Sequence, residues 1–258
     1  MPYIENDGVK IAYEIHGSGA PVVMLHGAAV SFAGNFGACG WIDPLNERGL
    51  QVIGMDFRGH GGSDKPEDPS DNGTDALTRD VIALLDHLGH QTALIVGYSI
   101  GSTVALHLLH THPERFRAAA LVATGDGIIG IGHRAFPIIL PPMVEILGWP
   151  ELPDGIPDSV AFYYNMAELV GGSRSGVAAS LSGEYPPCSM EEAASIRIPV
   201  LVVSGDEDIV LGMAPQLAET IPNARYMAVP GADHFGLAVN AEVQREVGDF
   251  LASASTGG

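Results

Sequence analysis

Short apolar runs recur along the chain, each bounded by polar residues or glycine. They cover residues 21–26, 51–56, 92–98, 118–123, 199–204 and 224–229. Nearly continuous apolar runs of this length are typical of strands that are buried on both faces of a parallel sheet. The pattern therefore predicts six core strands at these positions.

Two further β-prone runs, 3–5 and 10–16, flank Asn6-Asp7-Gly8 near the N-terminus. An Asp-Gly pair between such runs is a β-hairpin signal, because both residues tolerate the backbone of a tight turn. We therefore expect two antiparallel strands at one edge, which brings the sheet to about eight strands.

Stretches long enough for helices separate the predicted strands. They cover residues 75–88, 99–111, 213–221 and 241–252, with a further one at 35–47. Strands and helices that alternate in this way are typical of a doubly wound, mostly parallel α/β sheet. Pro113 and Pro222 stand where two of the helices should stop, since proline cannot continue a helical hydrogen-bond ladder.

The alternation breaks between residues 125 and 194, a segment that is rich in proline. The prolines are Pro137, Pro141, Pro142, Pro150, Pro153, Pro157, Pro186 and Pro187. Because proline interrupts helices and strands alike, we expect no long element here. The strand pattern resumes at 198–203, so we interpret 125–194 as a cap insertion at one end of the sheet within a single domain that spans residues 1–258.

The composition, with 46% hydrophobic and 17% charged residues, is that of a globular protein, and we expect disorder at most in the tail at 252–258. A formal net charge of -19 repels phosphate backbones and anionic lipids, so neither a nucleic-acid nor a membrane partner is expected. Two cysteines, Cys39 and Cys188, are too few for a disulfide framework. With no signal-peptide pattern and no long apolar run, we expect a cytoplasmic protein.

The strongest chemical signal is Gly97-Tyr98-Ser99-Ile100-Gly101, which follows one predicted strand and opens a predicted helix. A serine at such a strand-turn-helix junction is typical of a nucleophile elbow, in which small flanking residues let strand and helix approach closely. The amide of Ile100 would lie at the helix N-terminus, where a free N–H can stabilise an oxyanion.

Candidates for the acid and the base follow later strands. Gly205-Asp206-Glu207-Asp208 follows the strand at 199–204, and Asp233-His234-Phe235 follows the next strand. The ends of parallel strands form the sites of open α/β sheets, and the chain order serine, acid, histidine matches a catalytic triad. Asp126, after the strand at 118–123, and Asp206 are alternatives to Asp208. Asp206 directly follows the closing glycine of its strand, so we expect it to cap the turn.

Five segments in chain order resemble the α/β-hydrolase superfamily. They are Leu25-His26-Gly27-Ala28, 56–64, 97–101, 205–208 and 233–235. The resemblance implies Ser99 as nucleophile, Asp208 as acid and His234 as general base. It also implies that the amides of Ala28 and Ile100 form the oxyanion hole, and that His26 and His60 belong to structural loops.

The resemblance and the serine together predict a hydrolase that cleaves a small carboxylic ester or lactone through an acyl-enzyme, without a cofactor. Its partner would be a small-molecule acyl substrate. Epoxide hydrolases and dehalogenases of this fold carry an aspartate nucleophile, so Ser99 argues against both. In the cap, the apolar side chains of Phe136, Trp149 and Phe162 are candidates for the substrate pocket.

Other functions remain open on the same residues. The same triad could support cofactor-free perhydrolase or haloperoxidase activity. It could also support hydrolysis of a carbon–carbon bond. A ligand-binding receptor on this scaffold is another class. Gly125-Asp126-Gly127-Ile128-Ile129-Gly130 fits a dinucleotide fingerprint, but it lies late in the chain and runs into prolines. His107 and His110 have helical spacing, yet no nearby carboxylate or cysteine completes a metal site, and no metal is expected.

Overall fold

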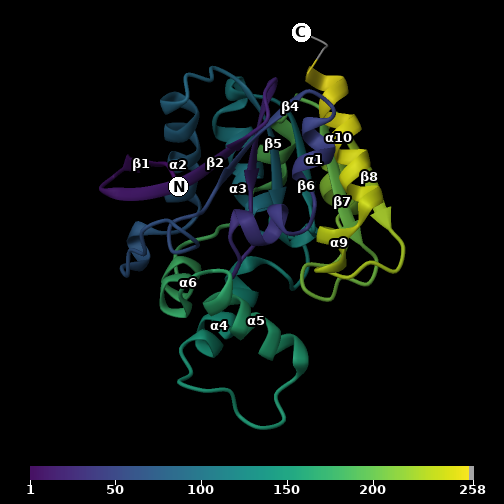
Figure 1. Ribbon diagram of the computed structural model, residues 1–258. Helices are drawn as coiled ribbons and strands as arrows, with labels where there is room; N and C mark the ends of the chain where they lie inside the picture. Colours follow the sequence, from purple (N-terminus) through teal and green to yellow (C-terminus); the bar gives the residue numbers. More distant parts are fainter. Residues whose placement is uncertain (256–258) are drawn as a thin grey trace.

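The computed structural model describes residues 1–255, apart from the side chain of Ser159. One eight-stranded sheet, in the order β1-β2-β4-β3-β5-β6-β7-β8, forms the centre of the molecule (Figure 1). Its strands are β1 (Tyr3–Asn6), β2 (Val9–His16), β3 (Ala20–Leu25), β4 (Leu50–Met55), β5 (Ala93–Tyr98), β6 (Phe116–Val122), β7 (Val200–Gly205) and β8 (Ala224–Val229).

The direction of the strands confirms the predicted fold class. β1 and β2 pair antiparallel, β2 pairs antiparallel with β4, and all pairs from β4 through β8 are parallel. Asp7 and Gly8, the two residues between β1 and β2, both have positive φ angles, of 52° and 76°. This is the conformation that an Asp-Gly hairpin turn requires, so the N-terminal prediction is also confirmed.

Both faces of the sheet are buried along β3 to β7, which explains the continuous apolar runs there, whereas only Val229 of the edge strand β8 is buried. Along β3, Val22 and Met24 belong to one core, whereas Val23 and Leu25 belong to the other. The first core also contains residues of α1 (Ile42–Asn46) and α10 (Ala241–Ser255). The second contains residues of α2 (Thr74–His87), α3 (Ile100–Thr111) and α8 (Pro215–Thr220). Within residues 1–255, none of the helices has the length and apolar character needed to cross a membrane.

Two expectations about the helices were wrong. The stretch at 35–47 forms a π-helix, η1 (Ala33–Gly37), and then α1, because Gly40 between them takes a φ of 84° that a continuous helix does not permit. At the other end of the chain, α10 continues to Ser255, three residues beyond the predicted end of this helix at 252, so this part of the tail is helical. The rest of the expected tail, 256–258, lies outside the described residues.

The segment between β6 and β7 is helical, which corrects the expectation that its prolines exclude long elements. It contains a short 3-10 turn, η4 (Asp126–Ile129), followed by α4 (Phe136–Leu147), α5 (Asp158–Leu169), α6 (Arg174–Leu181) and α7 (Met190–Ser195). Pro137 lies in the first turn of α4, where no backbone N–H is needed. Pro141 and Pro142 lie inside α4 but are exposed, so water can reach the carbonyls that they leave without a helical donor.

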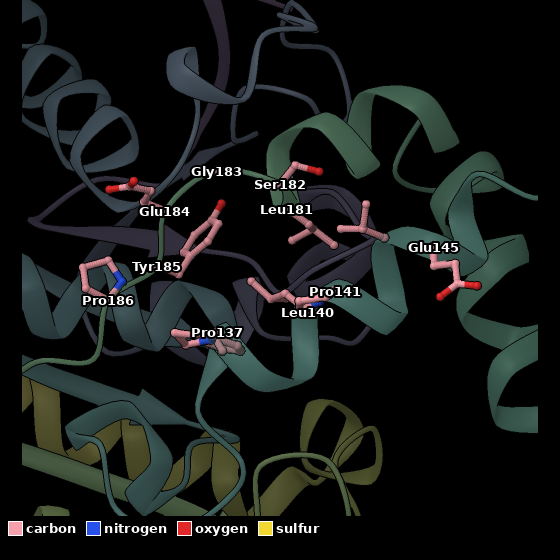
Figure 2. A pocket seen from close by; sticks show the side chains of 12 residues that line it. Pro137, Leu140, Pro141, Glu145, Leu181, Ser182, Gly183, Glu184, Tyr185 and Pro186 are labelled. Atoms are coloured by element: carbon pink, nitrogen blue, oxygen red, sulfur yellow. The ribbon is translucent and has the colours of Figure 1, made fainter.

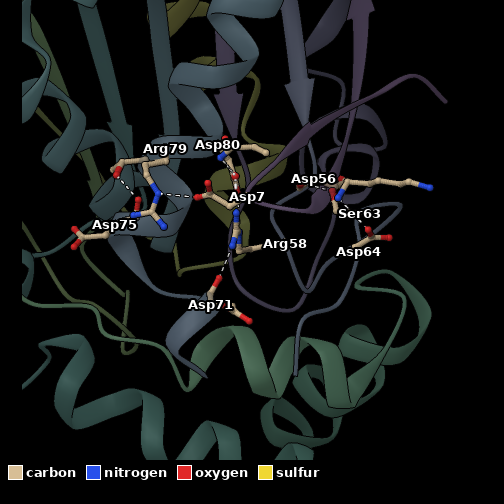
Figure 3. Close-up of polar contacts among 12 residues, drawn as sticks. Asp7, Asp56, Arg58, Ser63, Asp64, Asp71, Asp75, Arg79 and Asp80 are labelled. Carbon is tan, nitrogen blue, oxygen red and sulfur yellow. Dashed lines mark hydrogen bonds and ion pairs between the residues drawn. The ribbon is translucent and has the colours of Figure 1, made fainter. Parts of the chain in front are cut away.

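α4, α5 and α6 lie together beyond one end of the sheet (Figure 1). At the same end of the sheet, the loop after β4 is fixed by a buried ion pair. Arg58 donates from Nε to Asp80 Oδ2 at 2.8 Å and from Nη2 to Asp80 Oδ1 at 2.7 Å (Figure 3). Asp56, at the start of this loop, accepts from the Phe32 amide at 2.8 Å and so ties the loop to the chain after β3.

Candidate active site

Ser99 lies at the turn between β5 and α3 with a φ of 54°. A residue other than glycine in this region costs about 1–3 kcal/mol, so the surrounding packing must hold it there. The two flanking glycines make that packing possible. A Cβ on Gly97 would lie 2.4 Å from the carbonyl oxygen of Gly101, and one on Gly101 would lie 2.1 Å from that of Leu25. The predicted reason for both glycines, close approach of strand and helix, therefore agrees with the geometry.

The structure brings the three predicted side chains into one hydrogen-bonded chain. His234 Nε2 lies 3.0 Å from Ser99 Oγ, and His234 Nδ1 lies 2.8 Å from Asp208 Oδ2. Because a carboxylate can only accept, the proton of the neutral imidazole is on Nδ1. Nε2 is then free to accept the proton of the serine hydroxyl.

All three side chains are buried, with exposed fractions of 7% for Ser99, 5% for Asp208 and 6% for His234. Burial alone raises the pKa of the Asp208 carboxyl, but hydrogen bonds from His234 and from two backbone amides outweigh it and hold the pKa below its ordinary value. Asp208 is therefore a carboxylate at neutral pH, as an orienting partner for His234 must be.

The rival carboxylates have other partners. Asp206 Oδ1 accepts from the Gly231 amide at 2.7 Å, so it caps a turn in the loop after β8 and not the turn after its own strand. Asp126 Oδ1 accepts from the Leu217 amide at 2.8 Å, at the start of α8. Neither contacts His234, so Asp208 is the acid that the geometry favours.

The loop that carries His234 is anchored by Tyr98, for which the motif around Ser99 predicted no role of its own. The hydroxyl of Tyr98, the residue before Ser99, donates to the backbone carbonyl of His234. Their rings also meet edge to face, with centroids 6.0 Å apart. Tyr98 thereby couples the position of the base to that of the nucleophile. Its partner lies 136 residues away along the chain, and no local pattern signals such a pairing.

Two backbone amides next to Ser99 fit the expected oxyanion hole. A Cβ on Gly27 would lie 3.5 Å from Ser99 Cβ, so the chain after β3 passes close to the nucleophile. The amides of Ala28 and Ile100 donate to no other group within residues 1–255. Both N–H groups are therefore available to an oxygen bound beside Ser99.

His26 holds the first of these amides in place. Its Nδ1 donates to the Gly27 carbonyl at 2.7 Å, and its Nε2 accepts from the Phe57 amide at 3.0 Å. The Gly27 carbonyl and the Ala28 N–H belong to the same planar peptide, so fixing one orients the other. The structural role expected for His26 is thus a specific one, the orientation of a candidate oxyanion donor.

His26 and His60 are neighbours, with ring centroids 5.1 Å apart, and both are fully enclosed. Burial lowers the pKa of His26 to about 4. Burial, together with the nearby His26, lowers the pKa of His60 to about 3. Both rings are therefore neutral at physiological pH, and neither lies in the hydrogen-bonded chain from Asp208 to Ser99.

The three cap residues proposed for substrate binding lie in different surroundings. Phe162 of α5 packs edge to face on Phe235, with ring centroids 5.1 Å apart, and Phe235 in turn contacts the His234 ring. Trp149 is half-buried, and its backbone carbonyl accepts from the Tyr164 hydroxyl at 2.9 Å. Phe162 is therefore the cap residue that the ring contacts connect to the candidate triad.

Phe136 lines a cavity of about 640 Å³ between α4 and the end of α6, and its ring packs on Tyr185. Figure 2 shows Leu140 and Leu181 among the side chains around this cavity. None of the three candidate triad residues lines it. The expectation that Phe136 contacts the substrate remains a prediction.

The remaining motifs have structural explanations. The glycine-rich run at 125–130 forms the short turn η4 instead of opening a long helix. A Cβ on Gly125 would lie 1.9 Å from the Leu211 carbonyl oxygen, so glycine is needed there for packing. His107 Nε2 lies 3.0 Å from the Pro186 carbonyl oxygen, and His110 Nε2 lies 3.3 Å from Glu192 Oε1, so the two histidines have separate partners.

Comparison with known proteins gives a consistent picture. The family model of the alpha/beta hydrolase fold matches residues 20–165, more than half of the chain. The putative carbamate hydrolase RutD of Azorhizobium caulinodans is 27% identical over 269 residues, which cover 96% of each protein. The non-heme haloperoxidase of Rhodococcus erythropolis is 27% identical, with 98% of this chain and 100% of the relative covered.

Solved structures agree over nearly the full length. A structure described as Est816, an N-acyl homoserine lactone degrading enzyme, has a TM-score of 0.74 and 28% identity, and the match covers 95% of this chain and 98% of that one. An esterase from Exiguobacterium antarcticum shares the fold, with a TM-score of 0.71, 23% identity and 99% of each chain covered.

Proposed function

The chain belongs to the alpha/beta hydrolase fold family, as its motifs predicted, and on that premise we propose that it is a serine hydrolase of small carboxylic esters or lactones. The observation that carries the proposal is the continuous hydrogen-bonded chain from Asp208 through His234 to Ser99. A hydroxyl in such a chain can lose its proton as it attacks, which is what a serine nucleophile requires.

In the acylation step, Ser99 Oγ attacks the substrate carbonyl and His234 Nε2 takes the hydroxyl proton. The carbonyl oxygen gains negative charge, and the amides of Ala28 and Ile100 would donate to it. The ester C–O bond then breaks, and the proton on Nε2 passes to the departing alkoxide. Asp208 keeps the imidazole in the required tautomer and stabilises its charged form.

In the deacylation step, a water molecule attacks the acyl-enzyme carbonyl while His234 Nε2 accepts one of its protons. The bond to Ser99 Oγ breaks, the serine recovers a proton from His234, and the carboxylic acid leaves. A lactone follows the same course, except that the released alcohol stays attached to the acyl group. Each step uses groups of this chain, the substrate and water.

The named relatives support this substrate class. The similar structure at 28% identity is described as a lactone-degrading enzyme, and a relative at 27% identity is named a putative carbamate hydrolase. Lactones, esters and carbamates share a carbonyl that carries an oxygen leaving group. The triad described above is suited to that shared chemistry.

A second candidate is peracid formation, which is favoured by the 27% identity to a non-heme haloperoxidase across 98% of the chain. Hydrogen peroxide would replace water in the deacylation step, so that a peracid leaves in place of the acid. The ratio of peracid to acid released from one ester, measured over increasing peroxide concentrations, distinguishes the two outcomes.

Hydrolysis of p-nitrophenyl esters of graded chain length, together with a γ-lactone, tests the main proposal. We expect the wild-type protein to release acid from at least one of them and Ser99→Ala to be at least about 10⁴-fold slower. Circular dichroism should confirm that the variant is folded. A folded Ser99→Ala protein that retains activity within about tenfold of wild type would refute the assignment.

A further inference from the structure

Helix α5 is attached to both sides of the candidate active site. Near its start, Phe162 packs on Phe235, the neighbour of His234. Just past its end, Gly171 accepts from the Gly61 amide at 2.8 Å, and a Cβ on Gly171 would lie 3.2 Å from the carbonyl oxygen of Ala29, which follows the candidate oxyanion residue. The helix therefore extends from the base side of the site to the oxyanion side.

Ser99 lies between these two attachments. Its Oγ is 3.0 Å from His234 Nε2, and its Cβ is 3.5 Å from the Cβ position of Gly27. At 1.5 Å per residue, the eight residues from Phe162 to Leu169 span roughly 10 Å, about the width of a small acyl group and its leaving group. α5 is thus long enough to reach from the His234 loop to the chain after β3, and its inward face is a candidate wall of the substrate site.

That face carries Tyr163, Tyr164 and Ala167, of which Ala167 is fully buried. The two tyrosines differ in one respect. The Tyr164 hydroxyl donates to the Trp149 carbonyl, whereas the Tyr163 hydroxyl is buried and has no hydrogen-bond partner within the described part of the chain. Tyr163 also packs against the large core that covers the α2 and α3 side of the sheet.

An unpaired buried hydroxyl costs about 1–3 kcal/mol, so its retention needs a reason. Phenylalanine would fill the same space at no such cost. One such reason would be a hydrogen bond that the hydroxyl forms only while substrate is bound. Burial also raises the pKa of Tyr163, so the hydroxyl keeps its proton and can act as a donor.

We propose that Tyr163 Oη is a specificity-determining donor, which selects substrates whose acyl chain carries an oxygen acceptor beyond the scissile carbonyl. The proposal rests on the function assigned to Ser99, since it names the substrate class of that same site. An ether, carbonyl or hydroxyl oxygen on the acyl chain would satisfy the hydroxyl, whereas an all-carbon chain would leave it unpaired.

The test uses p-nitrophenyl hexanoate and three analogues in which oxygen replaces the methylene at carbon 3, 4 or 5. For each protein, kcat/KM for an analogue is divided by kcat/KM for hexanoate. Intrinsic differences in ester reactivity cancel when this ratio is compared between wild type, Tyr163→Phe and the matched control Tyr164→Phe. Ser99→Ala is assayed on hexanoate in parallel.

We expect one analogue to be preferred by the wild type, and its ratio to fall by about tenfold in Tyr163→Phe while it stays at the wild-type value in Tyr164→Phe. The proposal is overturned if no ratio changes in Tyr163→Phe, or if both variants lose the preference alike. Retained activity in Ser99→Ala would refute the proposed function itself, which is a separate outcome.

Thermal unfolding adds a readout that is independent of activity. Removing an unpaired hydroxyl should leave the melting temperature of Tyr163→Phe equal to or above that of the wild type. Removing the paired hydroxyl of Tyr164 should lower it by about 2 °C. A decrease in Tyr163→Phe as large as that in Tyr164→Phe would mean that the hydroxyl has a structural partner, and would overturn the proposal.

Discussion

Lowering the pH should destabilise this protein at pH values well above those at which carboxylates titrate, because His26 and His60 are buried as neutral rings. Their pKa values in the folded state are about 4 and about 3, whereas an unfolded chain has a histidine pKa of about 6.5. Below pH 6.5 the unfolded state binds protons at both residues and the folded state does not. The free energy of unfolding therefore falls as the pH falls.

The size of the effect follows from the two pKa shifts. Each pH unit below 6.5 costs about 1.4 kcal/mol per histidine, as long as the pH stays above the folded pKa values. Between pH 7 and pH 5 the loss is about 2 kcal/mol for each residue and about 4 kcal/mol for the pair. Urea unfolding, followed by tryptophan fluorescence at both pH values, measures it.

Two variants show whether these particular residues are responsible. His60→Gln removes one of the two buried titrating rings and should halve the loss between pH 7 and pH 5. His133 is exposed, so His133→Gln should leave the loss unchanged. A wild-type free energy of unfolding that differs by less than about 1 kcal/mol between the two pH values would refute the reasoning, as would an unchanged loss in His60→Gln.

Three further predictions concern the site and its support. Asp208→Asn should lower kcat by about 10⁴-fold because the imidazole loses its required tautomer. On the same ester, kcat of Asp206→Asn and of Asp126→Asn should stay within tenfold of wild type. An inactive Asp126→Asn together with an active Asp208→Asn would show that the acid is Asp126, after β6. Phe162→Ala should shift the preference among p-nitrophenyl esters towards longer chains, and an unchanged preference would count against its place in the pocket. Asp80→Asn leaves a buried guanidinium without its counter-charge and should lower the free energy of unfolding by about 3–5 kcal/mol in urea; a loss below 1 kcal/mol would contradict the buried pair.

The sheet could be predicted from the sequence because β3 to β7 are buried on both faces, which produces nearly unbroken apolar runs. At the edge, β8 is mostly half-buried or exposed, and its run contains Arg225. The position of the candidate site followed from the same pattern. Ser99, Asp208 and His234 each lie just after a predicted strand, and parallel strands end at one edge of a sheet. At these positions the local sequence pattern and the arrangement of the strands in the sheet point to the same place.

Prediction failed where tertiary or solvent context overrides a local rule. Pro141 and Pro142 were interpreted as helix breakers, yet α4 passes through both because their side of the helix is exposed. The bond from the Tyr98 hydroxyl to the His234 carbonyl and the packing of Phe162 on Phe235 join positions that are far apart along the chain. Pairings of this kind leave no periodic pattern in a single sequence.

The central claim is that Ser99 is an activated nucleophile, and labelling with a fluorophosphonate tests it most directly. In that reaction Ser99 Oγ bonds to phosphorus, fluoride leaves, and the hydroxyl proton passes to His234. After digestion with trypsin, mass spectrometry should find one phosphonyl group on the peptide that runs from Asp80 to Arg115, located at Ser99, with esterase activity lost in proportion. Complete inactivation with the label on another residue, or full activity in protein labelled at Ser99, would contradict the account.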